Sequence, residues 1–235
     1  MPTTDELCGL SAWLQVHDSA FPAGRLVHSN GFEEWLNSRP DSSGHDLEQL
    51  ALDHLEHAVA PLDAAGAALA WTARAGATAS ASLALRRLDA VLDSHKLSES
   101  ARIASHTAGT QLAATARRAG LADDESYLAA AVSGHTPGNL AIVEGALQAA
   151  LGIPRRIAVL GVLQSAFAGV LSAAVRLGRL GPLSAQRMHT RSRPRLVMLV
   201  DRACATPVEE LRSSTVLLEI CGMRHETRTN RLFAT

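Results

Sequence analysis

The sequence predicts an all-α fold, a single helical-bundle-like domain of about ten helices around a buried apolar central helix. The chain is 47% hydrophobic but only 3% aromatic. Its apolar mass is therefore mainly alanine and leucine, which favour helices over strands. No stretch alternates with a period of two, and one long run carries no charge. A length of 235 residues is enough for one substantial core, so we expect residues 1–235 to form one domain.

The central helix is expected at residues 157–175, which contain no charged side chain. One stripe along it is large and apolar, at Leu160, Leu163, Phe167 and Leu171. A second stripe is small, at Gly161, Ser165, Ala168 and Ser172. Large residues fill grooves between helices, and small ones let neighbouring backbones approach. Pro154 fits the first turn, and Arg176 and Arg179 suit the negative end of the helix dipole.

The same run is long enough to cross a membrane, so a small helical membrane protein built on residues 157–175 is an alternative. Only nine of its nineteen residues are Leu, Ile, Val or Phe, and Gln164 opposes insertion. No second such run exists, and residues 1–6 are polar and acidic, unlike a secretory signal. We favour a buried helix in a cytoplasmic protein.

Charge and cysteine content exclude several classes of partner and compartment. The net charge of -1 gives no global field for nucleic acid or an anionic membrane. Cys8, Cys204 and Cys221 are scattered and odd in number, which indicates a reducing compartment without a disulfide framework.

The N-terminal half predicts helices from apolar residues at helical spacing. They are expected at residues 5–16, 46–59, 62–74, 79–92 and 98–120. Pro61 should open the third, because proline suits a first turn. Ser98 caps the last and Gly120 ends it. Its packed face is predicted at Ile103, Gly109, Leu112 and Ala116.

The C-terminal half continues the helical pattern. Asp123 or Asp124 caps a helix that ends at Val132, and Asn139 caps the next. After the central helix, Pro194 should cut the chain, because a proline in a helix interior removes a hydrogen bond. The ranges are 123–132, 140–151, 184–193, 196–203 and 208–221.

Residues 18–35 predict an ordered loop that enters a helix. Turns are expected at Pro22-Ala23-Gly24 and Ser29-Asn30-Gly31, and apolar residues between them should pin the loop to the body. Such loops commonly carry function, here through His28 and Glu33. A purely structural loop, with His28 simply hydrogen-bonded, is the alternative.

Catalytic and metal-binding motifs are sparse. The chain contains no phosphate-binding loop, nucleophile elbow, HExxH or dinucleotide fingerprint. His54, Glu56 and His57 resemble a metal cluster only superficially, since they lack a further ligand. We therefore expect no enzyme, no cofactor and no resident metal. A hydrolase using His28 and Glu33 is the remaining catalytic alternative.

The C-terminus, residues 224–235, has the composition of a docking tail. It carries Arg224, His225, Glu226, Arg228 and Arg231 and ends with Leu232 and Phe233 before Ala234 and Thr235. Its charges resist burial, while the apolar pair needs a surface to cover it. A frayed or self-packed terminus is the alternative.

Four ordered blocks resemble the urease accessory protein UreF family. WLQVHDSAFPAGRLVHSNGFE at residues 13–33 is similar to its N-terminal signature. Arg102 with Ser105 resembles its Arg-x-x-Ser helix, and residues 173–177 through Gln186 resemble its arginine-leucine segment. Residues 224–233 resemble its C-terminal ending. The resemblance covers essentially the whole chain.

The chain departs from the family pattern at three places. Arg25 stands where the family usually has a second glycine, so a positive φ there would be strained. Residues 179–182 read RLGP where the family usually reads PLGQ, so any contact of that glutamine is lost to Pro182. Residues 98–101 also differ.

The resemblance implies a cytoplasmic, dimeric, non-enzymatic chaperone for urease maturation. Such proteins bridge the accessory protein UreD/UreH and the GTPase UreG, and the complex delivers nickel to apo-urease. Partner contacts are expected at residues shared with the family blocks: His28, Ser29, Glu33, Arg176, Gln186, Arg224, His225, Glu226, Arg231, Leu232 and Phe233.

Overall fold

Helices account for the ordered elements of the computed structural model, which describes residues 3–24, 31–76, 80–122 and 126–226. No strand occurs in these ranges, which confirms the all-α prediction. The elements are α1 (Thr4–His17), α2 (Phe32–Asn37), α3 (Gly44–His54), the π-helix η1 (Leu55–Ala64), α4 (Ala65–Ala75), α5 (Ala81–Ser94), α6 (Glu99–Arg118), α7 (Ser126–Val132), α8 (Leu140–Ala150), α9 (Arg155–Arg176), α10 (Pro182–Ala205), the 3-10 helix η2 (Val208–Glu210) and α11 (Val216–Glu226).

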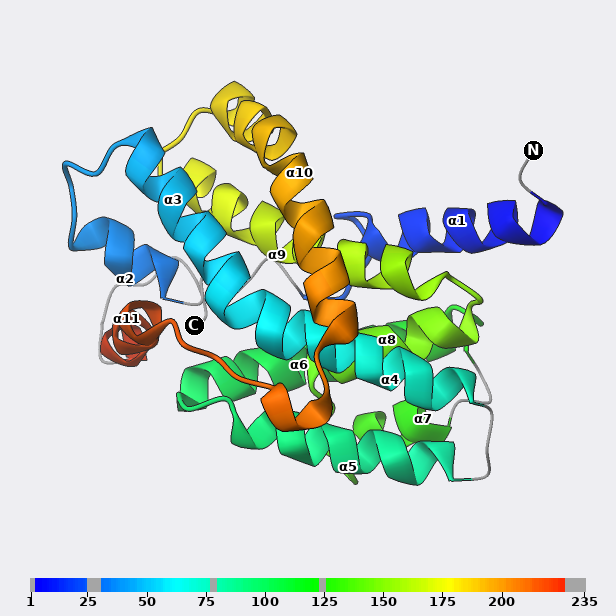
Figure 1. Ribbon diagram of the computed structural model, residues 1–235. Helices are drawn as coiled ribbons and strands as arrows, with labels where there is room; N and C mark the ends of the chain where they lie inside the picture. Colours follow the sequence, from blue (N-terminus) through cyan, green and yellow to red (C-terminus); the bar gives the residue numbers. More distant parts are fainter. Residues whose placement is uncertain (1–2, 25–30, 77–79, 123–125, 227–235) are drawn as a thin grey trace.

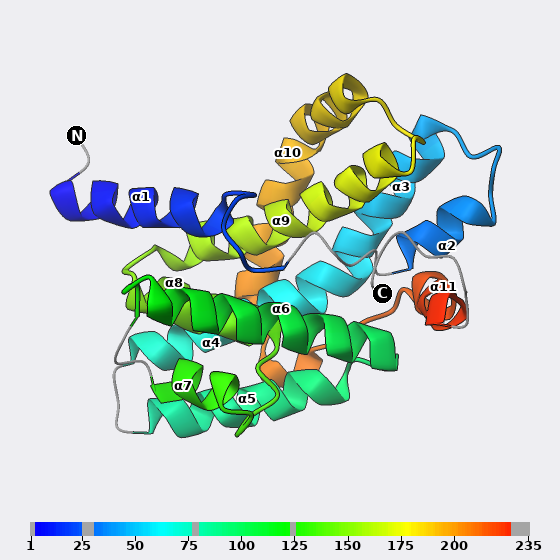
Figure 2. The same ribbon diagram turned by 180° about the vertical axis from the view of Figure 1, so that it is seen from behind.

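The core forms around α8 and α9. Residues 141–148 of α8 are all buried, and α8 packs between α4 and α6 (Figures 1 and 2). The predicted central helix is α9, which contacts α8, α4, η1 and α10. Pro154 is its N-cap residue, so the helix begins one residue later than expected. In the described ranges α9 alone is long and apolar enough to cross a membrane, and 56% of its most apolar window is buried in this core.

Pro61 does not start a new helix, contrary to the sequence prediction. The chain runs without a break from α3 through η1 to α4, and Pro61 lies inside the π-helical segment. A proline cannot donate to the carbonyl four residues earlier, which is that of His57. The His57 carbonyl instead accepts hydrogen bonds from Ser214, from the backbone N–H at 3.0 Å and the hydroxyl at 3.2 Å. The wider turn and this distant donor therefore remove the usual cost of the proline.

Two C-terminal predictions are also wrong. Pro194 does not cut α10. Its ring lies on the exposed side of the helix, so the Thr190 carbonyl that loses its backbone donor faces water rather than the core. The expected helix over residues 208–221 is split into η2 and α11. Between them Arg212 N–H donates to the Pro61 carbonyl at 3.2 Å, so residues 211–215 run extended along η1.

Glycines permit the closest helix contacts in the core. A Cβ on Gly145 of α8 would lie 2.2 Å from the Ala67 carbonyl oxygen of α4. A Cβ on Gly109 of α6 would lie 2.0 Å from the Gly138 carbonyl oxygen. The predicted packed face of α6 is therefore confirmed at Gly109, and also at the buried Leu112 and Ala116. Ile103 is an exception, since its side chain is 49% exposed.

The N-terminal helix α1 projects from the body (Figures 1 and 2). It contacts α9 at Gly161, where a Cβ would lie 2.3 Å from His17 Nε2. His17 Nδ1 lies 3.0 Å from Ser165 Oγ. Gly161 and Ser165 of the predicted small-residue stripe of α9 therefore form the surface on which α1 packs. The loop that follows is fixed where Thr115 Oγ1 donates to the Pro22 carbonyl at 3.1 Å.

Candidate partner-binding surfaces

The end of the N-terminal family block packs on α11, the helix that leads into the C-terminal block. Gly31 has φ of 84°, a conformation that favours glycine, and forms the N-cap of α2. A Cβ there would lie 2.4 Å from the Leu218 carbonyl oxygen and 3.0 Å from the Gly222 nitrogen. Glycine is therefore required on two grounds, and segments nearly 190 residues apart form one surface.

Of the predicted contact residues, Glu33 is a buried residue of α2. Its side chain is only 4% exposed, so it contributes to the interior beneath the α2 surface. Its neighbour Phe32 packs edge-on against His54, with ring centroids 5.3 Å apart. Burial lowers the pKa of His54 to about 4, although nearby Asp63 opposes the shift. His54 is therefore neutral at physiological pH.

Arg176 and Gln186 are both exposed and flank the turn between α9 and α10. That turn is fixed to α2 by Arg179, whose Nη1 donates to the Leu36 carbonyl at 2.8 Å. Its Nη2 donates to the Arg39 and Pro40 carbonyls and to Ser42 Oγ. The surface near α2 thus includes the turn that carries two predicted contact residues.

The predicted docking tail is described only at its start. Arg224 is exposed on α11, and residues 225 and 226 complete that helix. Arg231, Leu232 and Phe233 lie outside the described residues, as do His28, Ser29 and the departure Arg25.

A cleft of about 220 Å³ opens between η1, α6, α9 and α11. Small residues make the space, including Ala58, Ala104, Ala108, Ala166, Gly169 and Gly222. At its edge Lys96 Nζ pairs with Asp63 Oδ1 at 2.8 Å. His54 lines the cleft, whereas His57 is exposed on another side of η1. In the described ranges no three His, Cys, Asp or Glu residues are placed to hold a metal.

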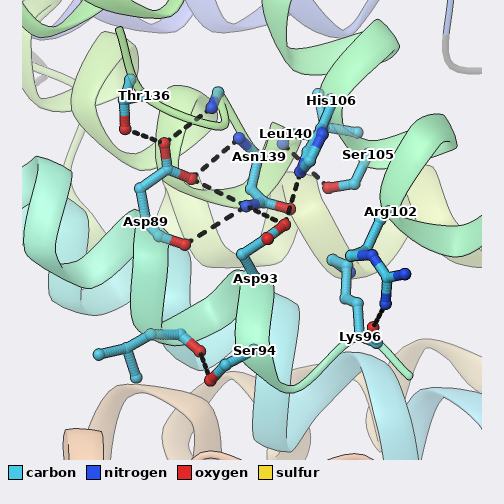
Figure 3. Close-up of polar contacts among 12 residues, drawn as sticks. Asp89, Asp93, Ser94, Lys96, Arg102, Ser105, His106, Thr136, Asn139 and Leu140 are labelled. Atoms are coloured by element: carbon cyan, nitrogen blue, oxygen red, sulfur yellow. Dashed lines mark hydrogen bonds and ion pairs between the residues drawn. The ribbon is translucent and has the colours of Figure 1, made fainter. Parts of the chain in front are cut away.

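A buried carboxylate, Asp89 of α5, organises the loop before α8 (Figure 3). It accepts hydrogen bonds from Thr136 Oγ1 and the Gly138 N–H, both at 2.7 Å, and from the Asn139 N–H at 3.0 Å. Asn139 is the N-cap residue of α8, as the sequence predicted, but its side chain donates to Asp89 and makes no cap bond to the helix. The first N–H of α8 instead donates to Ser105 Oγ at 3.2 Å.

The Arg-x-x-Ser block therefore has a structural role. Arg102 Nη1 donates to the Lys96 carbonyl at 2.7 Å and holds the α5–α6 turn, while Ser105 satisfies the start of α8. Sequence reasoning missed Asp89 altogether, and it named Arg179 without its contacts to residues 36–42. The turn residues 133–139 were visible in the sequence, but nothing local identified the carboxylate that binds them.

An ionic seam joins α3 and η1 to α10. Arg191 Nη2 pairs with Glu48 Oε2 at 2.7 Å, and Arg195 pairs with Glu56. Arg202 Nη1 lies 3.6 Å from Glu56 Oε1. Hydrogen bonding to Arg195 lowers the pKa of the Glu56 carboxyl. The seam holds one side of α10 against the body.

Comparison with known proteins decides the family. The UreF family model matches residues 42–193, well over half of the chain. The chain belongs to the UreF family. Its match begins just before α3 and ends within α10, so it covers η1, the core helices α8 and α9 and the Asp89 network.

Curated UreF proteins align over nearly the full length. The chain is 28% identical to urease accessory protein UreF of Agrobacterium fabrum, over 97% of this chain and 95% of that protein. It is 30% identical to UreF of a Mycobacterium species, over 96% of this chain and 99% of that protein. For UreF of Rhodopseudomonas palustris strain BisB5 the identity is 27% over 95% of this chain. The chain is thus a divergent member of the family, and the alignments extend beyond the family model to both sides.

Proposed function

We propose that this protein is a urease accessory chaperone that bridges UreD/UreH and the GTPase UreG for GTP-dependent insertion of nickel into apo-urease. The observation that carries the proposal is full-length membership of the UreF family, together with the junction at which the N-terminal signature packs on α11. The protein is proposed to act in the cytoplasm as a homodimer. One domain spans residues 1–235, and its end, residues 224–235, is the docking tail.

Two surfaces are assigned to the two partners. The tail that continues from α11 meets UreD/UreH, through Arg224, His225, Glu226, Arg231, Leu232 and Phe233. The surface around α2 and the α9–α10 turn meets UreG, through Arg176 and Gln186, with His28, Ser29 and the buried Glu33 shaping it. The rigid attachment of the turn by Arg179 supports this second assignment, since a preorganised surface loses less entropy on binding.

The protein contributes binding and placement rather than chemistry in this proposal. Its sequence has no phosphate-binding loop, so GTP turnover belongs to UreG and nickel is a cargo that passes through the assembled complex. Purified chain should therefore show no GTPase activity above a mock preparation and should bind no nickel in equilibrium dialysis at micromolar concentration. One nickel per chain under those conditions contradicts the cargo assignment.

Co-purification tests the proposal directly. Tagged chain, co-expressed with UreD/UreH and UreG from the same genome, should retain both through size-exclusion chromatography. Adding apo-urease, nickel and GTP to that complex should generate urease activity, and omission of this chain should abolish it. If neither UreD/UreH nor UreG co-purifies with the tagged chain, the proposed function is wrong.

A further inference from the structure

The five arginines of α10 fall into two classes. Arg191, Arg195 and Arg202 all form ion pairs with Glu48 or Glu56 in the seam with α3 and η1. Arg187 and Arg193 are exposed, and no described residue gives either one a hydrogen bond or ion pair. Two positive charges on α10 are thus left uncompensated within the described part of the chain.

Helical geometry places these two arginines at the edges of one exposed stripe. At 100° per residue they are about 120° apart around the axis and about 9 Å apart along it. Thr190 and Pro194 lie between them and are also exposed. Pro194 lacks an N–H, so the Thr190 carbonyl has no donor from the following turn and remains a further acceptor on this stripe.

Large apolar side chains extend the same stripe in both directions. Leu183 is 64% exposed, Val197 49% and Met198 57%. Beyond them the Asp201 carboxylate is already paired with Arg156 at 2.7 Å. Arginine and methionine are enriched at protein interfaces relative to the rest of a protein surface, and exposed apolar side chains beside them gain by being covered.

The stripe faces outward and adjoins the surface assigned to UreG. In Figure 1, α10 passes in front of the other helices, and its N-terminal part follows directly from the α9–α10 turn. Exposed Gln186 precedes Arg187, and Arg176 lies on the other side of that turn. A partner bound at the α9–α10 turn can therefore also contact the N-terminal part of α10, because the two surfaces are continuous.

We propose that the stripe formed by Leu183, Arg187, Thr190, Arg193, Pro194, Val197 and Met198 docks an acidic, apolar-edged surface of UreG. The inference rests on the proposed function and adds the chemistry of the partner surface. The arginines require carboxylates at both edges of the stripe, offset by about 9 Å along the helix axis and also separated across its width, and the apolar ends require aliphatic neighbours beside them. Each arginine favours a bidentate carboxylate, so lysine replaces it only in part.

The test uses the whole chain in complex with UreD/UreH, immobilised, with purified GTP-bound UreG as the probe. The double variant Arg187→Glu/Arg193→Glu should raise the Kd for UreG at least about tenfold, mainly through slower association at low salt. The matched control is Arg86→Glu/Arg87→Glu on α5, since that pair is also exposed beside apolar Leu83 and Val91. It should leave the Kd within about twofold, because its charges lie outside the proposed surface.

The outcomes separate the inference from the proposed function. Unchanged UreG affinity of the α10 variant, with a wild-type chain that binds normally, overturns the inference and leaves the function intact. An equal loss in the α5 control, or loss of UreD/UreH or of self-association instead of UreG, also overturns it. Failure of the wild-type complex to bind UreG overturns the proposed function and the inference with it. Recovery of affinity by a Glu→Arg change on UreG that pairs with Arg187→Glu gives positive support.

Discussion

The guanidinium of Arg179 donates a 2.8 Å hydrogen bond to the carbonyl oxygen of Leu36, a residue 143 positions earlier in the chain. The same side chain reaches three further oxygens in residues 39–42. Carbonyls at the end of a short helix have no partner within it. Arg179 adds a charged donor to the Leu36 carbonyl at the end of α2, which also accepts from the Arg39 N–H at 3.3 Å, and it joins the following turn to the start of α10.

Arg179→Ala should therefore lower the free energy of unfolding by about 2 kcal/mol, because several charge-assisted hydrogen bonds are lost together. Urea denaturation followed by circular dichroism measures this. Arg179→Lys should recover less than half, since an ammonium cannot span the four acceptors. The control Arg187→Ala should change stability by less than about 0.5 kcal/mol. A loss in Arg179→Ala no larger than in that control contradicts the assigned role.

The Asp89 network predicts a larger effect. Asp89→Asn replaces one carboxylate oxygen with an amide NH₂ group, which is a donor. In the wild-type chain both oxygens accept hydrogen bonds from N–H and hydroxyl groups, so the new amide donor would face another donor. We expect a loss of about 3 kcal/mol or more in unfolding free energy, because buried donors are left unpaired. Asp41→Asn, at an exposed site, is the matched control and should be nearly neutral. Hydrogen exchange should locate the change in residues 133–140, and protection unchanged there refutes the account.

Two helix glycines should respond in opposite directions to the same substitution. Gly145→Ala places a methyl group 2.2 Å from the Ala67 carbonyl oxygen and must push α8 from α4, which costs about 1 to 3 kcal/mol. Gly169→Ala on α9 meets no atom within 4 Å, so it gains about 0.5 to 1 kcal/mol from helix propensity. Thermal unfolding measures both effects: the midpoint of Gly145→Ala should lie below that of wild type, and the midpoint of Gly169→Ala above it. Equal shifts in the same direction contradict the packing argument.

His54 makes stability depend on pH. Its pKa is lowered to about 4 in the folded chain, mainly by burial, from an ordinary value of 6.5. The unfolded chain therefore binds more protons between those two values, and stability falls as pH is lowered from about 6.5 toward 4. The full shift corresponds to about 3 kcal/mol. His54→Gln should flatten this part of the stability profile, whereas His57→Gln, at an exposed position one turn away, should keep the wild-type slope.

Local sequence rules predicted most helices but misjudged both interior prolines. The rule that proline ends a helix assumes that the released carbonyl stays unsatisfied. For Pro61 the missing donor is Ser214, which no local window includes. For Pro194 exposure to water removes the penalty. Hydrophobic spacing likewise predicted the core face of α6 but not the exposure of Ile103, because spacing does not say how far a neighbouring helix extends.

The candidate site was predictable only as a set of blocks. The order of the motifs along the chain identified the two terminal signatures, and folding brings Gly31 of the first against Leu218 and Gly222, which precede the second. The sequence offered no way to see that Glu33 is buried or that Asp89 binds a loop almost 50 residues away, since both depend on tertiary contacts. The paired arginines of α10, such as Arg191 and Arg195, cannot be distinguished in sequence from the exposed Arg187 and Arg193. The difference depends on where folding places Glu48 and Glu56.

The C-terminal tail gives the prediction most closely tied to function. Leu232 and Phe233 each gain about 1.5 to 3 kcal/mol if fully buried by UreD/UreH. Fixing the backbone of one residue on binding costs about 1 to 2 kcal/mol of entropy, so two apolar anchors are insufficient for a segment of this length. Charge-assisted hydrogen bonds from Arg228 and Arg231, worth about 1.5 to 3 kcal/mol each, are required as well.

Deleting residues 229–235 should therefore abolish capture of UreD/UreH while leaving helicity and thermal midpoint nearly unchanged, since the buried Leu218 and Cys221 of α11 remain. Leu232→Ala/Phe233→Ala and Arg231→Ala should each weaken binding, and Thr229→Ala/Asn230→Ala serves as the control because it removes neither an apolar anchor nor a charge. If the truncated protein instead unfolds, residues 229–235 are part of the core and not a docking tail. Normal binding by a folded truncated protein shows that docking depends on the remainder of the surface, because neither the anchors nor Arg231 would then be needed.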